Sequence, residues 1–127
     1  MGYNRIETLN CENNPDKDCA VDAALSIIGG KWKLKIYKVL KAGGPFRYAA
    51  IHKALTGISE KTLSAQLREL EEDGIVTKQV FPEVPPRVEY TLTDLGISLE
   101  PVFVALINWG QTYIQTTKTV GQSAQQA

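Results

Sequence analysis

The chain has 127 residues, a length typical of one compact domain, and 43% of them are hydrophobic and 22% charged. This composition excludes disorder throughout, and the sequence holds no stretch of about 18 apolar residues that could span a membrane. The first residues are polar and acidic rather than a secretory signal, so we expect a cytoplasmic protein.

The chain is poor in residues that perform catalysis or bind metals. It has two cysteines, Cys11 and Cys19, and one histidine, His52, without a Cys-x-x-Cys pair. It also has no phosphate-binding loop, no dinucleotide fingerprint and no serine nucleophile motif. We therefore expect no enzyme activity, no metal site and no cofactor.

The net charge is zero, but the charges are segregated along the chain. Residues 31–68 hold nine lysines and arginines against Glu60 alone, a net charge of +8. The segments before and after it are acidic, with net charges of −3 and −5. A basic centre within a neutral protein indicates a surface that meets a polyanion locally.

Apolar residues at helical spacing predict four helices in the first part of the chain. They are expected over residues 18–28, 31–41, 48–55 and 60–73. Asp18 and Ser59 are candidate N-caps, and Gly74 is a natural C-terminal cap. In the second helix we interpret Lys33 and Lys41 as solvated residues that only keep the surface soluble.

The spacing of apolar residues then changes to two, which predicts a β-hairpin. Its strands are expected over residues 75–81 and 87–92, and the segment 82–86 between them is rich in proline and stiff. The short turn between the third and fourth helices, followed by this hairpin, predicts a winged helix-turn-helix. The fold class is therefore mainly α with a small β-hairpin, an α+β arrangement.

Thr93 or Asp94 is the candidate N-cap of a final helical region, and Pro101 is expected to divide this region into a short helix and a longer one. The organisation that follows has an arm over residues 1–18, the winged domain with its last helix over 19–117, and a frayed tail over 118–127.

The fourth helix is the candidate DNA-reading element. Leu63, Leu67 and Leu70 form its buried stripe, so polar and basic residues lie on the opposite face. An ordinary amphipathic surface helix has the same period, but the turn before it and the hairpin after it favour a recognition helix. The side chains expected in the major groove are Lys61, Thr62, Ser64, Ala65 and Arg68.

Three further basic residues are candidate DNA contacts. Arg47 and Lys53 border the third helix, where phosphate contacts anchor such motifs. Arg87 follows a proline pair and has two interpretations: it enters a narrow minor groove, or it pairs with Glu83 or Glu89.

The last helical region carries more apolar surface than a small domain covers. Its large apolar residues include Phe103, Ile107, Trp109 and Tyr113. One interpretation is a two-fold dimer, which would place two recognition helices about 34 Å apart on a near-palindromic DNA site. The other interpretation is that this helix packs back on its own domain.

Several segments resemble the HxlR family of bacterial winged-helix transcription regulators, which are MarR-like. They span residues 19–110 in the family's order: Cys19, 24–32, 45–48, 57–64, 67–74, 82–93 and 109–110. The wing segment Pro82–Tyr90 is the most specific of them. The resemblance implies sequence-specific binding to double-stranded DNA by a homodimer that is held by the first and last helices.

Some members of that family sense oxidants, electrophiles or quinones through the cysteine that Cys19 matches. The resemblance therefore implies a redox sensor at Cys19, although Ala20 stands where many members have proline. Three aspartates near Cys19 disfavour a thiolate there. A disulfide from Cys19 to Cys11, or across a dimer, remains open.

Two other functions also remain open. In the first, the winged helix serves protein association, and its basic segment meets an acidic partner surface. In the second, the regulator responds to a small-molecule effector held between the dimer helices and the winged domain. Trp32, Trp109 and Tyr113 would line that site, although core packing accounts for them as well.

Overall fold

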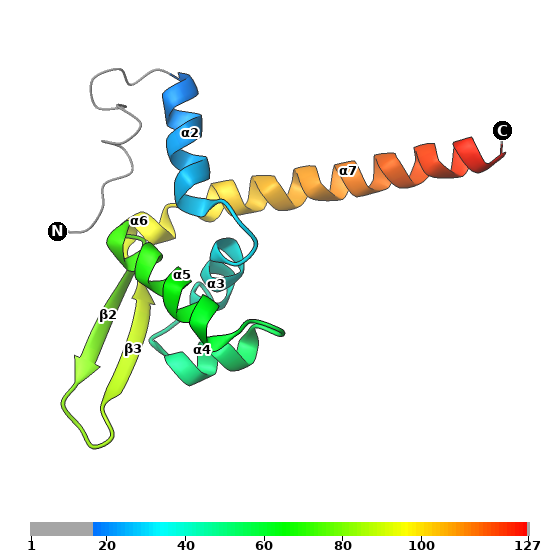
Figure 1. Cartoon of the computed structure of the whole chain (residues 1–127). Coiled ribbons are helices and arrows are strands. Elements are labelled where there is room, and N and C mark those ends of the chain that lie inside the picture. Colours follow the sequence, from blue (N-terminus) through cyan, green and yellow to red (C-terminus); the bar gives the residue numbers. More distant parts are fainter. Residues whose placement is uncertain (1–16, 127) are drawn as a thin grey trace. The chain divides into compact units, whose positions relative to one another are not determined.

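In the computed structural model, which describes residues 17–126, the chain forms two units that divide between Ile97 and Ser98 (Figure 1). The first unit contains α2 (Lys17–Ile28), α3 (Lys33–Leu40), β1 (Phe46–Arg47), α4 (Tyr48–Ala54), α5 (Glu60–Glu72), β2 (Val76–Phe81), β3 (Arg87–Leu92) and α6 (Asp94–Ile97). The second unit holds one long helix, α7 (Glu100–Gln126).

The predicted helices are present, and two of them begin at other residues than expected. α2 starts at Lys17, so Asp18 lies in its first turn rather than at its N-cap. α3 starts at Lys33 rather than Lys31, with Trp32 at the N-cap position. Gly30 has a φ of +97°, which lies outside the range of a right-handed helix, so α3 can begin only after this residue.

The sheet has three strands, where the sequence predicted only a hairpin. The predicted pair is present as β2 and β3, which are antiparallel from Val76 opposite Leu92 to Phe81 opposite Arg87. β1 adds to the other side of β3, with Phe46 opposite Tyr90, and gives the strand order β1-β3-β2. The strand β1 was missed because two residues are too short to show an alternating pattern.

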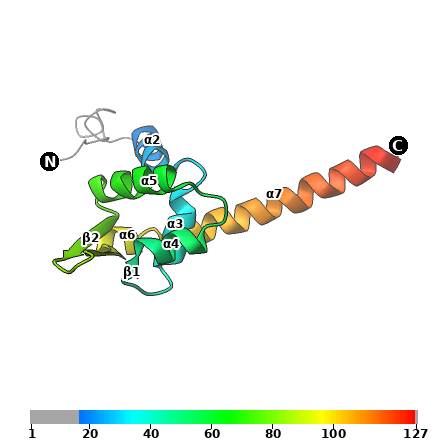
Figure 2. The same cartoon turned by 60° about the horizontal axis from the view of Figure 1, so that its bottom comes forward.

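The core of the first unit lies where α3, α4 and α5 meet the sheet (Figure 2). The buried side chains come from every one of these elements: Ile36, Tyr37, Leu40, Ile51, Leu63, Leu67, Leu70, Val76 and Tyr90. Burying an aliphatic side chain of this size contributes roughly 1.5–3 kcal/mol, so α5 is held firmly by its leucine face. Its opposite face is fixed toward solvent as a result.

The predicted caps of α5 are confirmed. At its start, the backbone N–H of Thr62 donates to Ser59 Oγ at 3.1 Å. At its end, Gly74 adopts a φ of +78° and Ile75 N–H donates to the Leu70 carbonyl at 2.9 Å. A left-handed residue followed by this bond terminates the helix and aims the chain into β2.

The final helical region is divided as predicted, into the short α6 and the long α7. Thr93 caps α6, since Gly96 N–H donates to Thr93 Oγ1 at 3.0 Å. Pro101 lies in the first turn of α7, where its missing N–H costs nothing. α7 continues to Gln126, through the segment expected to be a frayed tail. None of the described helices is long and apolar enough to cross a membrane.

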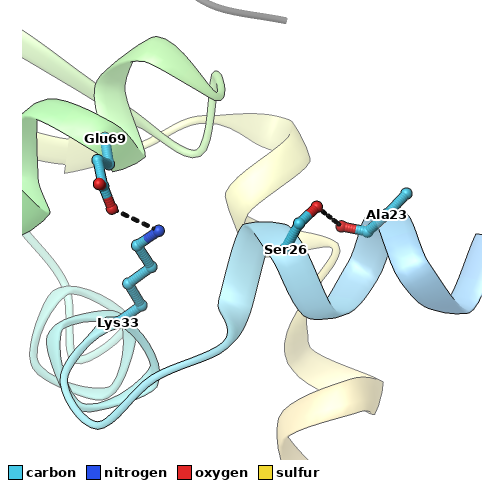
Figure 3. A network of polar contacts seen from close by, with 4 residues as sticks. All are labelled: Ala23, Ser26, Lys33 and Glu69. Atoms are coloured by element: carbon cyan, nitrogen blue, oxygen red, sulfur yellow. Dashed lines mark hydrogen bonds and ion pairs between the residues drawn. The ribbon is translucent and has the colours of Figure 1, made fainter. Parts of the chain in front are cut away.

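Lys33 was interpreted wrongly as a solvated residue. Its side chain is 5% exposed, and its Nζ lies 2.7 Å from Glu69 Oε2 of α5 (Figure 3). The sequence pattern hides this pair because its two members are far apart in the chain. Lys41 is exposed as expected, with its Nζ 6.0 Å from the ring centroid of Tyr37.

Candidate nucleic-acid interface

The outward face of α5 presents the residues expected to read DNA. Lys61, Ser64 and Arg68 are exposed, and their spacing of three and four residues places them on one side of the helix. Ala65 on the same side is half-buried. These side chains therefore do not pack in the core of the first unit and are accessible to a ligand.

Thr62 is engaged within the helix start rather than directed wholly outward. Its side chain is half-buried, and Thr62 Oγ1 accepts a hydrogen bond from the Ser59 hydroxyl at 2.9 Å. The first turn of a helix carries a partial positive charge, which favours anions such as phosphate. Thr62 thus stabilises the N-terminal end of α5. In a recognition helix this end contacts the base edges in the major groove.

Sequence reasoning missed Tyr48, which lies at the start of α4. Its hydroxyl donates to the Glu60 carbonyl at 3.0 Å and lies 3.2 Å from Ser64 Oγ. These contacts join the two helices of the motif, α4 and α5 (Figure 1). No periodic pattern in the sequence points to a residue that acts through a hydroxyl across two helices.

His52 fixes the turn between α4 and α5. Its Nε2 donates to the Ile58 carbonyl at 3.0 Å, since a carbonyl oxygen only accepts. Its ring stacks on that of Tyr48, with centroids 6.3 Å apart and planes 9° apart. The turn also contains Gly57, whose φ of +85° suits glycine. The single histidine therefore has a structural role in the motif.

The two expected phosphate contacts lie at opposite ends of α4. Arg47 is exposed at the N-cap position, and Lys53 is exposed in the last turn. Arg47 also belongs to β1, where it lies opposite Glu89 of β3. Both cations are accessible to a polyanion that approaches this helix.

Arg87 is held within the wing. Its Nη2 lies 3.4 Å from Glu83 Oε1, and its Nη1 lies 3.6 Å from Glu89 Oε1. Its guanidinium covers the Phe81 ring at 3.9 Å, and its Nε is buried without a hydrogen-bond partner. Of the two interpretations, the structure therefore shows the ion pair, and Arg87 forms it with both glutamates. To contact DNA, Arg87 would have to leave these carboxylates for a phosphate or a base.

Tyr90 lies buried in β3, next to this interface. Burial raises the pKa of its hydroxyl above the ordinary value of 10.0, and Glu71 and Tyr48 raise the pKa further. The hydroxyl therefore stays neutral at physiological pH and acts as a core group rather than as an acid.

The aromatic residues considered for an effector site do not share one unit. Trp32 is half-buried beside an open cavity of about 400 Å³, and Lys31 and Lys35 each place Nζ 4.9 Å from its ring centroid. Trp109 and Tyr113 belong to α7, where they are mostly exposed and stack with centroids 5.5 Å apart. Among the described residues, no group of three or more His, Cys, Asp or Glu side chains could hold a metal ion.

Cys19 lies in the first turns of α2 and is half-buried. It is disulfide-bonded, so its sulfur is not present as a free thiol. Cys11 and the rest of the expected arm up to residue 16 lie outside the residues that the structure describes.

A core of three helices, of which the capped α5 presents a polar face outward, and a two-stranded wing together define a winged helix-turn-helix protein of the type that regulates transcription. A family model described as HxlR-like helix-turn-helix matches residues 27–118. The chain belongs to this family and is a transcriptional regulator of the helix-turn-helix type.

Individual proteins agree with this assignment. A helix-turn-helix-type transcriptional regulator of Methanothermobacter thermautotrophicus is 42% identical over 84% of this chain and 80% of its own length. A MarR-family transcriptional regulator from Enterococcus faecalis V583 is 42% identical, with a TM-score of 0.71 over 82% of this chain and 94% of that one. The redox regulator HypR in its reduced form is 37% identical, with a TM-score of 0.72 over 79% of this chain and 98% of that one.

Proposed function

We propose that this protein is a homodimeric regulator that binds double-stranded DNA of defined, near-palindromic sequence, without catalytic activity and within the cytoplasm. The outward face of α5 enters the major groove and reads base edges. The residues that contact DNA are Lys61, Thr62, Ser64, Ala65 and Arg68 of α5, Arg47 and Lys53 beside α4, and Arg87 of the wing.

The observation that carries this proposal is the outward face of α5. Lys61 and Arg68 are exposed there, while Leu63 and Leu67 fix the opposite face in the core at 0% and 1% exposure. Glu60 is the one acidic residue in the first turn of the helix, and Glu69, Glu71 and Glu72 lie in its last four residues, so a polyanion meets few like charges at the N-terminal end. Lysine and arginine on such a face recognise guanine edges and phosphates.

DNA fits this surface better than an acidic protein partner does. Arg47 and Lys53 add cations at both ends of α4, which matches the backbone contacts that anchor a helix-turn-helix on a duplex. The relative from Methanothermobacter thermautotrophicus carries the name of a transcriptional regulator of this type. Association with a protein is therefore the less favoured alternative.

The second copy of the dimer would cover the apolar side chains of α7. Leu106, Ile107, Trp109 and Ile114 are between 43% and 66% exposed in the single chain. An exposed apolar surface of this kind marks an interaction site. A two-fold axis through it would present two α5 helices to successive major grooves of one duplex.

A response to oxidants at Cys19 is a second part of the proposal. Cys19 is disulfide-bonded, and the structurally similar HypR is described as a redox regulator. Making or breaking a bond at the first turns of α2 would alter a helix that the dimer is expected to use. If Cys19→Ser leaves the response of DNA binding to diamide and to a thiol reductant unchanged, Cys19 is not the sensor, and a small-molecule effector becomes the trigger to seek.

The experiment that tests DNA binding is a fluorescence-anisotropy titration of the full chain. The duplexes are the DNA upstream of the protein's own gene and a shuffled fragment of the same composition, each at low and moderate salt. We expect tighter binding to the native fragment, weakened steeply by salt. Equal binding to both fragments without any salt dependence would favour protein association instead.

A further inference from the structure

Two hydroxyl groups meet at the surface where α4 and α5 come together. Tyr48 is the first residue of α4, and Ser64 lies on the exposed face of α5. Their oxygens are 3.2 Å apart, and the Tyr48 hydroxyl is also 3.0 Å from the Glu60 carbonyl oxygen. The positions of the two hydroxyl protons determine whether Ser64 can donate a hydrogen bond to a DNA base or can only accept one.

The count of protons fixes the direction of both hydrogen bonds. A phenol carries one proton, and a carbonyl oxygen only accepts, so the contact with Glu60 uses the proton of Tyr48. The contact between the two hydroxyls is then a hydrogen bond only if Ser64 donates its own single proton to the Tyr48 oxygen. This arrangement satisfies both contacts and leaves Ser64 with lone pairs but no free proton.

The Tyr48 ring is restrained in the position that this arrangement needs. It stacks on His52, whose Nε2 in turn donates to the Ile58 carbonyl in the turn before α5. A stacked ring on one helix and a hydrogen-bonded turn on the next keep the hydroxyl oxygen within hydrogen-bond distance of both Glu60 and Ser64. The donor and acceptor roles are therefore set before any ligand arrives.

Bases differ in what they present in the major groove. Adenine N6 and cytosine N4 donate protons, whereas guanine N7 and O6 and thymine O4 accept them. We propose that Tyr48 makes Ser64 an acceptor-only reader of bases, which selects adenine or cytosine over guanine or thymine on the strand that it faces. This inference rests on the proposed function, since it requires α5 to lie in the major groove.

The test is selection of duplexes from a randomised DNA library by the wild-type chain and by Tyr48→Phe, Ser64→Ala and Thr112→Val. Tyr48→Phe keeps the stacked ring and removes only the hydroxyl, so Ser64 regains a proton to donate. Thr112→Val is the control, because it removes an exposed hydroxyl of α7 that donates to the Asn108 carbonyl of the same helix. Circular dichroism during thermal unfolding verifies that each variant is folded.

We expect the wild-type chain to enrich adenine or cytosine at one position of each half-site. Ser64→Ala should lose that preference by roughly three- to tenfold, the range of one hydrogen bond. Tyr48→Phe should admit guanine or thymine at the same position, and Thr112→Val should change nothing. In a Tyr48→Phe background, Ser64→Ala should remove the newly admitted bases.

Three results would overturn the inference. One is a Tyr48→Phe profile identical to the wild type while Ser64→Ala changes the profile, which would mean that Ser64 reads bases independently of Tyr48. Another is enrichment of guanine or thymine by the wild type at the position that Ser64→Ala affects, and the third is a Ser64→Ala profile equal to the wild type. A wild-type chain that enriches no sequence would instead remove the proposed function, and this inference with it.

Discussion

Lys33 and Glu69 connect the first residue of α3 to the C-terminal half of α5, with Lys33 Nζ 2.7 Å from Glu69 Oε2 (Figure 3). The lysine is 5% exposed and the carboxylate 41% exposed, so the positive charge is the more desolvated member. A cation at the first turn of a helix is unfavourable beside the positive end of the helix dipole. Glu69 offsets this effect and at the same time joins the proposed recognition helix to the core.

Glu69→Gln should therefore destabilise the protein. It leaves a buried ammonium group without its carboxylate, at a cost of about 1–3 kcal/mol in the free energy of unfolding. Lys33→Met removes the buried charge but keeps the aliphatic stem, and should cost less than Glu69→Gln. Urea denaturation measures both variants.

Glu72→Gln provides the control for that pair, because Glu72 is exposed on the same helix. It should change the free energy of unfolding by no more than about 0.5 kcal/mol. Equal stability of the Glu69→Gln and Glu72→Gln proteins would mean that the ion pair with Lys33 contributes nothing to the fold.

Substitution of a base-contacting residue and of a phosphate-contacting residue should affect DNA binding in different ways. Arg68→Ala on the outward face of α5 should cost about 1–3 kcal/mol of binding to the native DNA fragment and relax its sequence preference. Lys53→Ala should weaken binding on all sequences alike and lower the slope of log K against log salt by about 1. Lys118→Ala, an exposed lysine of α7, is the matched control for loss of a charge. If Arg68→Ala weakened binding equally on all sequences, Arg68 would be a phosphate contact.

Freeing Arg87 from its carboxylates should strengthen DNA binding. The double variant Glu83→Gln/Glu89→Gln removes both ion-pair partners, so the guanidinium no longer exchanges one anion for another when it meets a phosphate or the minor groove. We expect anisotropy to show a higher affinity and a steeper salt dependence.

Removal of two negative charges could also raise the affinity without any involvement of Arg87. The same double substitution in an Arg87→Ala background separates the two causes. A gain of equal size in that background would contradict a role for Arg87 in binding and would leave it as a residue that only stiffens the wing.

The apolar face of α7 should control the oligomeric state. Ile114→Glu places a charge on a residue that is 62% exposed in the single chain, so the fold of each chain should survive while association weakens at least tenfold. Thr112→Glu is the control, because two residues correspond to about 200° around a helix and place Thr112 on the other side. Analytical ultracentrifugation should show a monomer for Ile114→Glu only. A wild-type monomer at micromolar concentration would contradict the proposed dimer.

The local structure of the winged unit could be predicted well because its signals are local. Leu63, Leu67 and Leu70 show helical spacing within one segment, and Ser59 and Gly74 have the side-chain and backbone properties that begin and end a helix. These signals determined α5 and its outward face without any knowledge of the rest of the chain.

The features that the sequence did not reveal depend on contacts between distant segments. Nothing near Lys33 distinguishes it from the exposed lysines of the same helix, because its partner Glu69 comes from α5. β1 exists only because β3 lies beside it, and Tyr48 gains its role only when α4 is placed against α5. Arg87 had two competing interpretations because both its glutamates and a DNA groove offer negative charge.

Protection of guanine N7 from dimethyl sulfate on a bound duplex tests the central claim most directly, because this atom lies in the major groove. The duplex is one that the wild-type chain selects from the randomised library. Hydroxyl-radical footprinting of the same complex reports the contacts to the DNA backbone. We expect two protected major-groove segments about one helical turn apart, and loss of guanine protection in Arg68→Ala but not in Lys118→Ala. Backbone protection without any change at guanine N7, or protection unchanged in Arg68→Ala, would contradict a reading role for α5.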